Sequence, residues 1–339
     1  MRRLAVLLVG LLVLAAPAQA AKKPPASWAQ AQIEAVVAAG LMAPTAAEFR
    51  PGDLLTKGEL DEILRLVGKP PALPAGDPSL PVKLRELDAA LVRALGLGKT
   101  AKRFRSALVA VGLKPPAYAG VEIVARLVGL RTNHPQADDA VEVGPNSAVD
   151  RAETAYSIAR WLEARASGLG SVVAGQASAF TLPELTEWQA RVLARAVRFV
   201  GYPYIWGGSS DRSQAPFGVK VPGGFDCSGF VWRVYKLEPF DGAPALAETL
   251  QGRTTYEMSR EVTKALRIPF DQIQPADVLF FGDRGPKSKP GQIGHMGIYL
   301  GGGWMIHSSS RGTTITSLEG WYTERFAWAR RPLAEAGLA

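Results

Sequence analysis

The chain has 339 residues, and its 39 lysines and arginines outnumber its 31 aspartates and glutamates, which gives a formal net charge of +8. Its single cysteine, Cys227, excludes an internal disulfide. The basic residues form no dense cluster, so nucleic acid is not expected as a partner, whereas a mild basic excess suits an anionic surface such as a cell wall. The length is enough for two or more domains.

Residues 1–20 are expected to be a secretory signal peptide. Two arginines precede an apolar stretch over residues 4–16, and a small-residue pattern, Ala-Gln-Ala, ends at Ala20. This order predicts cleavage after Ala20 and a mature protein that is secreted or lies in the cell envelope. The alternative is a retained membrane anchor, which requires a longer apolar stretch. No later segment has the roughly 18 apolar residues of a membrane span, so we expect none.

Residues 21–165 are predicted to form an all-α domain of helical repeats. Three segments, 55–68, 82–96 and 149–163, each place a glutamate early and then apolar residues at helical spacing. Each is therefore expected to be one amphipathic helix with an acidic residue in its first turn, where the helix dipole favours a negative charge.

This layout resembles the S-layer homology module, a three-copy helical unit that binds polysaccharides attached to the bacterial cell wall. The family's Thr-Arg-Ala-Glu step appears at residues 56–59, 83–86 and 150–153, and only the third copy keeps the arginine in place, as Arg151. The resemblance implies that the repeats bind an anionic cell-wall polysaccharide. The alternative is a helical bundle that only holds or covers the next domain. The landmarks of the first copy are Trp28, Ile33, Gly40, Leu41, Phe49, Pro51, Thr56 and Glu59.

Residues 166–182 are small, contain glycine and serine and carry no charge, which is typical of a linker or a domain boundary. Residues 183–339 form the predicted second domain. This domain is expected to open with a helix that Thr186 caps and that carries Trp188 and Val192 among its apolar positions.

Cys227 lies in the stretch PGGFDCSGFVWRVY, residues 222–235. Two glycines permit a tight turn, Asp226 can cap a helix, and the apolar residues that follow recur at helical spacing. Cys227 is then in the first turn of a helix, where unpaired backbone N–H groups and the positive end of the dipole favour a thiolate. The pattern indicates a nucleophile, and the alternative is a small residue chosen only for packing at a crowded helix start.

A thiol nucleophile needs a base, and the chain has three histidines. His134 lies in a polar loop of the first domain and is expected at the surface. His295 and His307 flank a predicted β-hairpin, and each lies six residues from Gly301. A turn centred on Gly301 places both rings on one face and nearly opposite one another, where they can act as base and orienting group. Ordinary surface residues, or a zinc site with Cys227, are the alternatives.

The second domain resembles the NlpC/P60 cysteine peptidases, secreted or envelope enzymes that cut the peptide stems of bacterial peptidoglycan. The resemblance runs from about Glu184 to Phe326. Its five motifs, in the family's order, are GYPYIWGG (201–208), GFDCSGFVWRVY (224–235), PADVLFF (275–281), GHMGIYLGGG (294–303) and MIHSSS (305–310).

The resemblance implies a papain-like α+β fold in which the nucleophile helix packs on an antiparallel sheet, preceded by the all-α repeat domain. It implies Cys227 as the nucleophile, His295 as the base and His307 as a third, orienting residue. The backbone N–H of Cys227 is expected to help hold the oxyanion. Neither a cofactor nor a metal is implied, because a thiolate and two histidines suffice for the chemistry. The residues implied to line the substrate site are Tyr204, Asp226 and Ser228.

Two insertions depart from the family's pattern. The motif GYPYIWGG, residues 201–208, is called the tyrosine loop, and residues 209–223 lengthen the stretch between it and Cys227. Residues 282–292 form a long polar, basic segment before His295. We expect both to overhang the cleft, where they would narrow the choice of stem peptide or contact anionic wall polymer. Ala276 stands where the family usually has glycine, and we expect this exchange to be harmless.

The sequence thus predicts a secreted peptidoglycan hydrolase that acts by acyl-enzyme chemistry on peptide stems. The family commonly cuts the bond between γ-D-glutamate and a diamino acid, which is therefore the expected scissile bond. Two alternatives come from other classes of protein: a non-catalytic cell-wall-binding protein, and an acyltransferase or amidase on the same fold.

Overall fold

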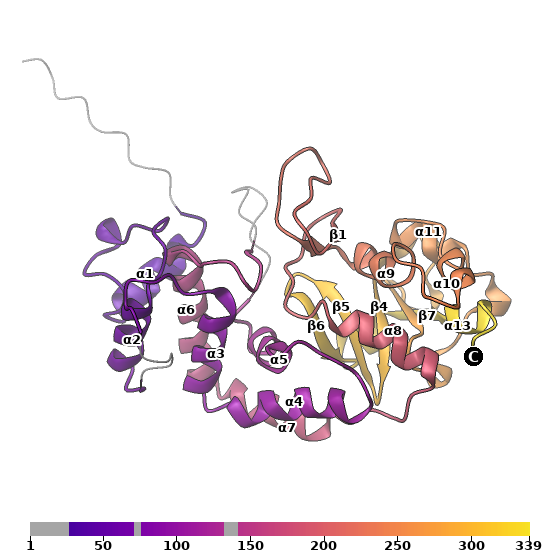
Figure 1. The fold of residues 1–339 in the computed structure, drawn as a ribbon, viewed down its shortest axis with the longest axis horizontal. Coiled ribbons are helices and arrows are strands. Elements are labelled where there is room, and N and C mark those ends of the chain that lie inside the picture. Colours follow the sequence, from indigo (N-terminus) through magenta and orange to yellow (C-terminus); the bar gives the residue numbers. More distant parts are fainter. Residues whose placement is uncertain (1–26, 71–75, 132–141) are drawn as a thin grey trace, which may run out of the picture.

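The computed structural model describes residues 27–70, 76–131 and 142–339. The predicted signal peptide, residues 1–20, and the surface prediction for His134 lie outside these residues. Figure 1 shows helices α1 to α7 grouped beside a second part in which helices cover a β-sheet, with the C-terminus at the far end. Within the described ranges, no helix is long and apolar enough to cross a membrane.

The helical part begins its main helices where the sequence predicts them. The hydroxyl of Thr56 accepts a hydrogen bond from the N–H of Glu59, and the Glu59 carboxylate accepts one from the N–H of Thr56 at 2.9 Å. Asp150 caps α6 by accepting from the N–H of Glu153 at 2.7 Å. The bounds are α1 Gln30–Ala38, α2 Lys57–Leu66, α3 Leu84–Ala94, α4 Gly98–Ala110, α5 Ala119–Leu127, α6 Arg151–Ser167 and α7 Leu169–Ala179.

The starts of the three predicted repeat helices meet in space. The residues just before α2, α3 and α6 are joined by isolated β-bridges. The paired residues are Leu54 with Asp150, Thr56 with Pro81, and Lys83 with Ala148. The three helices therefore share one junction, as expected of repeated units that bury a common core.

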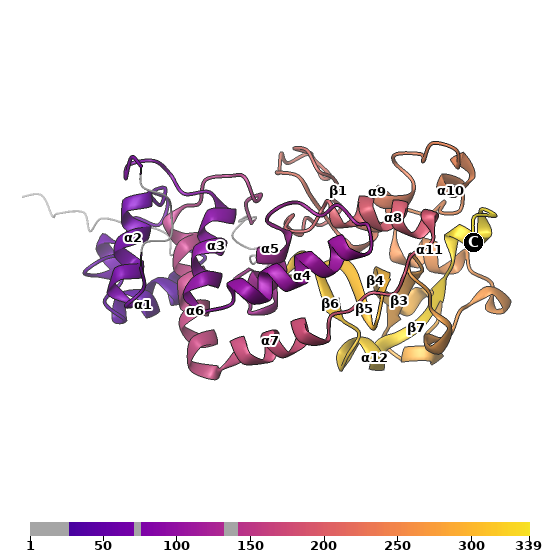
Figure 2. The same ribbon diagram turned by 60° about the horizontal axis from the view of Figure 1, so that its bottom comes forward.

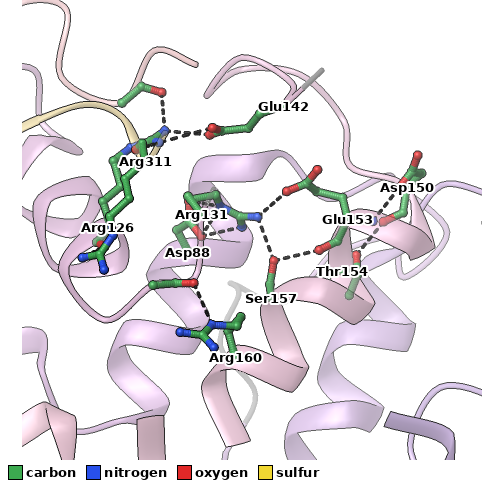
Figure 3. Close-up of polar contacts among 12 residues, drawn as sticks. Asp88, Arg126, Arg131, Glu142, Asp150, Glu153, Thr154, Ser157, Arg160 and Arg311 are labelled. Carbon is green, nitrogen blue, oxygen red and sulfur yellow. Dashed lines mark hydrogen bonds and ion pairs between the residues drawn. The ribbon is translucent and has the colours of Figure 1, made fainter. Parts of the chain in front are cut away.

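A buried ionic cluster holds α3 and α6 together, as Figure 3 shows. Arg131, which follows α5, donates hydrogen bonds to Asp88 of α3 at 2.9 Å and to Glu153 and Ser157 of α6, each at 2.7 Å. The side chains of Arg131 and Asp88 are wholly buried. Because each charge has an opposite partner, the free energy of removing it from water is offset. We call these four residues the Arg131 cluster.

Residues 166–182 do not form the linker that the sequence predicts. Most of them form α7, which follows α6 after Gly168 and packs against α4, as Figure 2 shows. Val173 and Ala177 on one face of α7 are buried. Small residues give little contrast between a buried and an exposed face, so composition alone could not reveal this helix.

Arg126 of α5 ties the helical part to the C-terminal part (Figure 3). Its wholly buried guanidinium donates to the carbonyl oxygens of Gly201, at 2.8 Å, and of Arg311, and it pairs with Glu142 at 2.7 Å. Glu122, one helical turn earlier, lies 3.5 Å from Arg126 and borders Gly201. One arginine thus holds two segments of the C-terminal part, and we call these contacts the Arg126 clamp.

Three aromatic rings fill the same boundary. Phe104 of α4, Phe180 after α7 and Trp304 of the sheet lie with their ring centroids 4.9 to 5.8 Å apart, and all three are buried. The hydrophobic core continues from α1 into the sheet. The two parts therefore fold against each other over a shared apolar core.

The C-terminal part is an antiparallel sheet covered by helices, which confirms the predicted α+β class. Its strand order is β6-β5-β4-β3-β7, and Figure 2 shows these strands side by side. Helix α9, which carries Cys227, packs on β4 and β5. The strands are β1 Ser209–Ser210, β2 Gly224–Phe225, β3 Val278–Gly282, β4 Ile293–Gly301, β5 Trp304–Ser309, β6 Gly312–Ser317 and β7 Phe326–Arg330. The helices are α8 Glu187–Val197, α9 Cys227–Tyr235, α10 Pro244–Glu248, α11 Thr255–Arg260, α12 Trp321–Arg325 and α13 Pro332–Glu335.

Candidate active site

Cys227 is the first residue of α9, and Asp226 caps that helix. The Asp226 carboxylate accepts a hydrogen bond from the N–H of Gly229, which anchors the first turn. A side chain at Gly229 would clash, because a Cβ there would lie 1.9 Å from the carbonyl oxygen of Gly208. The glycine therefore lets the start of the helix approach the loop 204–208, and Cys227 lies where the two meet.

The thiol of Cys227 is a neutral group at rest. Only 8% of the residue is exposed. Burial and the nearby Asp226 carboxylate raise the pKa of the thiol to about 12, although the backbone N–H groups of Ser228 and Met296 lower it. The expected stabilisation of a thiolate at the helix start is thus outweighed by burial. The contact with the Met296 N–H places the sulfur beside β4, the strand that carries His295.

His295 and His307 form a hydrogen-bonded pair on one face of the sheet. Nε2 of His295 lies 2.7 Å from Nδ1 of His307, and the ring planes are 79° apart. The predicted hairpin and the shared face are confirmed, but the two residues are not directly opposite. Ile298 pairs with Ile306, so the pairing is centred one residue beyond Gly301 and the histidines lie diagonally. The offset arises because Gly301 pairs with Trp304, which places the turn at Gly302 and Gly303 rather than at Gly301.

Three aromatic side chains surround the histidine pair. The ring centroids of Phe281, Tyr322 and Trp321 lie 5.8, 6.2 and 6.4 Å from that of His295. Burial lowers the pKa of His295 to about 4 and holds the pKa of His307 well below its usual value, so both rings are neutral at pH 7. Trp321 and Tyr322 belong to none of the motifs found in the sequence. The adjacent aromatic residues just before the last strand were the available signal.

Arg253 fixes the opposite side of the site, and sequence reasoning missed it as well. Its guanidinium donates to the Asp226 carboxylate at 3.2 Å and to the Ser228 hydroxyl at 2.8 Å. It also donates to the carbonyl oxygens of Gly207 and Gly208 at 3.0 and 3.2 Å. Arg253 thus locks two predicted substrate residues to the tyrosine loop. No motif marked it, because its partners lie far away along the chain.

Tyr204 lies on the same loop and completes the set of predicted residues around the thiol. Burial, followed by the proximity of Cys227 and Asp226, raises the pKa of its phenol above the usual value. The hydroxyl therefore stays protonated and can donate a hydrogen bond. The structure brings Tyr204, Asp226 and Ser228 into one cleft with Cys227.

This cleft has a volume of about 360 Å³. Pro216 and Phe217 of the first insertion line it, as predicted for residues 209–223. The second insertion, residues 282–292, contributes none of the described lining residues. Its turns pack against β7, α11 and α12 instead, so the prediction that it overhangs the cleft is wrong. The remaining lining residues are Tyr204, Trp206, Gly207, Asp226, Cys227, Ser228, Arg253, Thr254, Thr255, Tyr256 and Gly294.

The two histidines do not turn a nitrogen toward a common ion. The nitrogens that face each other, Nε2 of His295 and Nδ1 of His307, are at hydrogen-bond distance. In the part of the chain that the structure describes, no group of three or more histidine, cysteine, aspartate or glutamate side chains is arranged to hold a metal ion.

A second cavity, of about 570 Å³, lies between α1 and α2 in the helical part. Glu59, Glu62 and Arg151 are among its lining residues. Arg151 is held by an ion pair with Glu59 and by a hydrogen bond of 2.8 Å to the carbonyl oxygen of Phe49. Arg151, the one arginine that keeps its place in the repeat step, therefore binds other residues of the same domain.

Two family models match the chain. Residues 201–331 match the model of the NlpC/P60 family, and residues 23–60 match the model of the S-layer homology domain. The second match spans the first of the three predicted repeats.

Individual relatives match the C-terminal part. Over 140 residues, the chain is 30% identical to gamma-D-glutamyl-L-lysine dipeptidyl-peptidase of Bacillus subtilis (strain 168), a match that covers 40% of this chain and 38% of that protein. Over 135 residues, it is 34% identical to the murein DD-endopeptidase MepH of Escherichia coli (strain K12), covering 39% and 41%. A crystal structure of an NlpC/P60 family protein from Bacillus cereus ATCC 10987 is 28% identical, with a TM-score of 0.32, covering 46% and 43%. The chain spans less than half the length of these relatives.

Proposed function

Residues 201–331 form an NlpC/P60 domain, and on this basis we propose that the protein is a peptidoglycan endopeptidase whose nucleophile is Cys227. The observation that carries the proposal is the position of Cys227 at the start of α9, in a cleft, on a helix that packs on β4 and β5, the two strands that carry the hydrogen-bonded pair of His295 and His307. The matched relatives from Bacillus subtilis and Escherichia coli are named as peptidases, which supports the same reaction class.

Proton transfer from the thiol to His295 starts the reaction. Nε2 of His295 contacts His307, so Nδ1 is the nitrogen that takes the proton of Cys227. Because burial holds both groups neutral at rest, the proton moves as the sulfur attacks the carbonyl carbon. The imidazolium that forms donates from Nε2–H to Nδ1 of His307, which orients the ring.

The attack produces a tetrahedral intermediate, a thioester and then the products. The backbone N–H of Cys227, at the start of α9, stabilises the oxyanion. The C–N bond breaks, and the departing amine takes the proton from His295. A water molecule then gives a proton to His295 and adds to the thioester, which releases a carboxylic acid and restores the thiol.

The proposed scissile bond joins γ-D-glutamate to a diamino acid in the stem. Tyr204 donates a hydrogen bond from its protonated phenol, and Arg253 holds Asp226 and Ser228 in place along the cleft. These groups are fixed before substrate arrives, so little ordering of side chains is needed on binding. The Bacillus subtilis relative bears a name that describes action at a γ-D-glutamyl bond to lysine.

The helical part is proposed to hold the enzyme on a cell-wall polysaccharide, outside the cytoplasm. The match of residues 23–60 to the S-layer homology domain supports this role, and residues 1–20 have the pattern of a secretory signal.

The deciding experiment is mass spectrometry of purified peptidoglycan after digestion by residues 21–339, by the Cys227→Ser variant and by a Ser171→Ala control on the exposed side of α7. We expect new stem fragments, whose summed masses exceed that of the uncut stem by one water per cut, from the unchanged protein and the control only. Fragments that persist with Cys227→Ser would overturn the assignment of the nucleophile. Products that gain an acyl group would indicate a transferase, and no change with any protein would indicate a wall-binding protein.

A further inference from the structure

The mouth of the Cys227 cleft carries an unusual group of exposed aromatic side chains. Trp206, Phe217 and Tyr256 all line the cleft, yet 61%, 68% and 48% of their surfaces are exposed. They come from three separate segments: the tyrosine loop, the first insertion and the second residue of α11. We call these three residues the aromatic rim. Exposed apolar residues gathered at a cleft commonly mark a ligand-binding surface.

Phe217 of the rim is held in place by the loop that carries it. Gln214 and Val221 exchange backbone hydrogen bonds of 3.0 and 2.8 Å, which closes the insertion into a narrow arm. The side chain of Gln214 joins this arm to the body of the domain, because it donates to the carbonyl oxygen of Gly224 at 2.8 Å and accepts from the N–H of Ser209 at 2.9 Å. Figure 1 shows the arm as the long loop that rises beside β1.

The ring of Phe217 at the end of this arm is turned back onto the tyrosine loop. A Cβ at Gly207 would lie 2.9 Å from Cε2 of Phe217, so the ring rests directly on that glycine. Val219, two residues later, is 69% exposed and does not line the cleft. The arm thus presents one apolar side chain to the cleft and another away from it.

We propose that the aromatic rim binds an amino sugar of the glycan strand that carries the stem peptide, so that the enzyme acts on glycan-linked stems in preference to free peptides. This inference rests on the proposed function. The apolar C–H face of a sugar ring covers an aromatic ring well, while its hydroxyl and amide edges stay in water. A flat, exposed, uncharged ring at a cleft mouth is suited to such a face.

The length of the stem peptide is consistent with an amino sugar at the aromatic rim. In a peptidoglycan stem, two residues separate the amino sugar from the bond between γ-D-glutamate and the diamino acid. Two extended residues span roughly 7 Å. A sugar attached to a stem whose scissile bond lies at Cys227 therefore comes to rest at the mouth of the same cleft, and the rim residues line that cleft.

The test compares two soluble substrates that differ only in the sugar: a disaccharide-linked stem peptide and the same peptide with the disaccharide removed. The variants are Phe217→Ser and, as a matched control on the same arm, Val219→Ser. We expect Phe217→Ser to lower kcat/KM for the glycan-linked substrate about tenfold more than kcat/KM for the free peptide, the effect of uncovering roughly 50 Å² of apolar surface that only the sugar covers. Val219→Ser should change neither.

Equal losses on both substrates would assign the rim to the peptide and overturn the proposal, as would no loss on either. Failure of the proposed function has a different signature, because then the unchanged protein cleaves neither substrate. In that case the Cys227→Ser protein is titrated with both molecules by calorimetry. Tighter binding of the glycan-linked peptide that Phe217→Ser weakens and Val219→Ser does not would still support the rim, and equal binding of both molecules would reject it.

Discussion

The buried arginines of the helical part and the Cys227 site bury titratable side chains in opposite ways. In the helical part, Arg131 and Arg126 are wholly buried, and each contacts carboxylates. At the Cys227 site, the thiol and the ring of His307 are buried and the ring of His295 is half-buried; among the described residues no carboxylate pairs with either ring, and desolvation holds all three groups neutral.

This contrast separates a structural arrangement from a reactive one. A buried charge with an opposite partner is held firmly, because any movement leaves charges unpaired in a medium of low dielectric constant. The neutral thiol of Cys227 and the neutral ring of His295 have no such restraint. The proton can therefore move from sulfur to nitrogen when the sulfur attacks the carbonyl carbon of the substrate. The extent of burial alone therefore does not identify a reactive site; the pairing of charges within it does.

The largest expected effect lies in the helical part. Arg131→Met leaves the carboxylates of Asp88 and Glu153 buried without their cation, so the free energy of unfolding should fall by about 3 to 5 kcal/mol. Urea denaturation measures this loss. Arg65→Met, which removes an exposed pair with Glu62, is the control and should have little effect. Equal losses of stability from both variants would contradict the role of the Arg131 cluster.

The next effect concerns the hydrogen-bonded pair of His295 and His307. His307→Leu removes the acceptor for Nε2–H of His295, and kcat for stem cleavage should fall about 100-fold with little change in KM. His307→Asn places an amide oxygen near the position of Nδ1 and should recover part of the loss, which a purely structural role for His307 does not predict. Steady-state kinetics with both variants decides between the two roles. Similar activity for the Leu and Asn variants would contradict the orienting role.

Glu122 in the helical part and His295 at the candidate site should also make stability depend on pH with opposite signs. Burial, followed by the Asp88 carboxylate, raises the pKa of Glu122 to about 8, so folded protein keeps a proton that unfolded protein loses above pH 4.5. This contribution to stability is lost as pH rises from 4.5 to 8. His295, with its pKa lowered to about 4, stays neutral in folded protein while unfolded protein takes up a proton below pH 6.5, so its contribution is lost as pH falls. Each slope is at most about 1.4 kcal/mol per pH unit.

Variants separate these two slopes. Between pH 6.5 and 8 the contribution of Glu122 is the larger one, so Glu122→Gln should flatten the fall in stability there. His295→Gln should flatten the loss of stability between pH 6.5 and 4. Thermal unfolding across this range provides the measurement, and an unchanged slope above pH 6.5 with Glu122→Gln would count against a protonated carboxyl in folded protein.

The smallest effect concerns the backbone. Helices α1, α2 and α3 are followed by glycines at positive φ, namely Gly40, Gly68 and Gly96, whereas Ala276 in the C-terminal part has a φ of +71°. Left-handed backbone is strained for alanine, so Ala276→Gly should stabilise the protein by up to about 1 kcal/mol rather than being neutral. Chemical denaturation tests this, with Ala329→Gly in a buried strand as a control that should destabilise.

Much of the fold and of the candidate site followed from local patterns in the sequence. The helix starts at Thr56 and Asp150, the nucleophile helix from Cys227 and the hairpin that carries both histidines depend on residues close together along the chain. Capping groups, glycine turns and apolar spacing act over a few residues, so the sequence by itself determined these elements. The α+β class was implied by the family resemblance that the five motifs carry.

Only the tertiary structure decided the features that depend on distant residues or on solvent exclusion. The diagonal offset of His295 and His307 comes from the position of the turn at Gly302 and Gly303, and the protonation of Cys227 comes from its degree of burial. Arg253 reaches Asp226 across 27 positions, and Arg126 reaches Arg311 across 185. No local pattern encodes such pairs, because the free energy that selects them arises when separate segments pack together and exclude water.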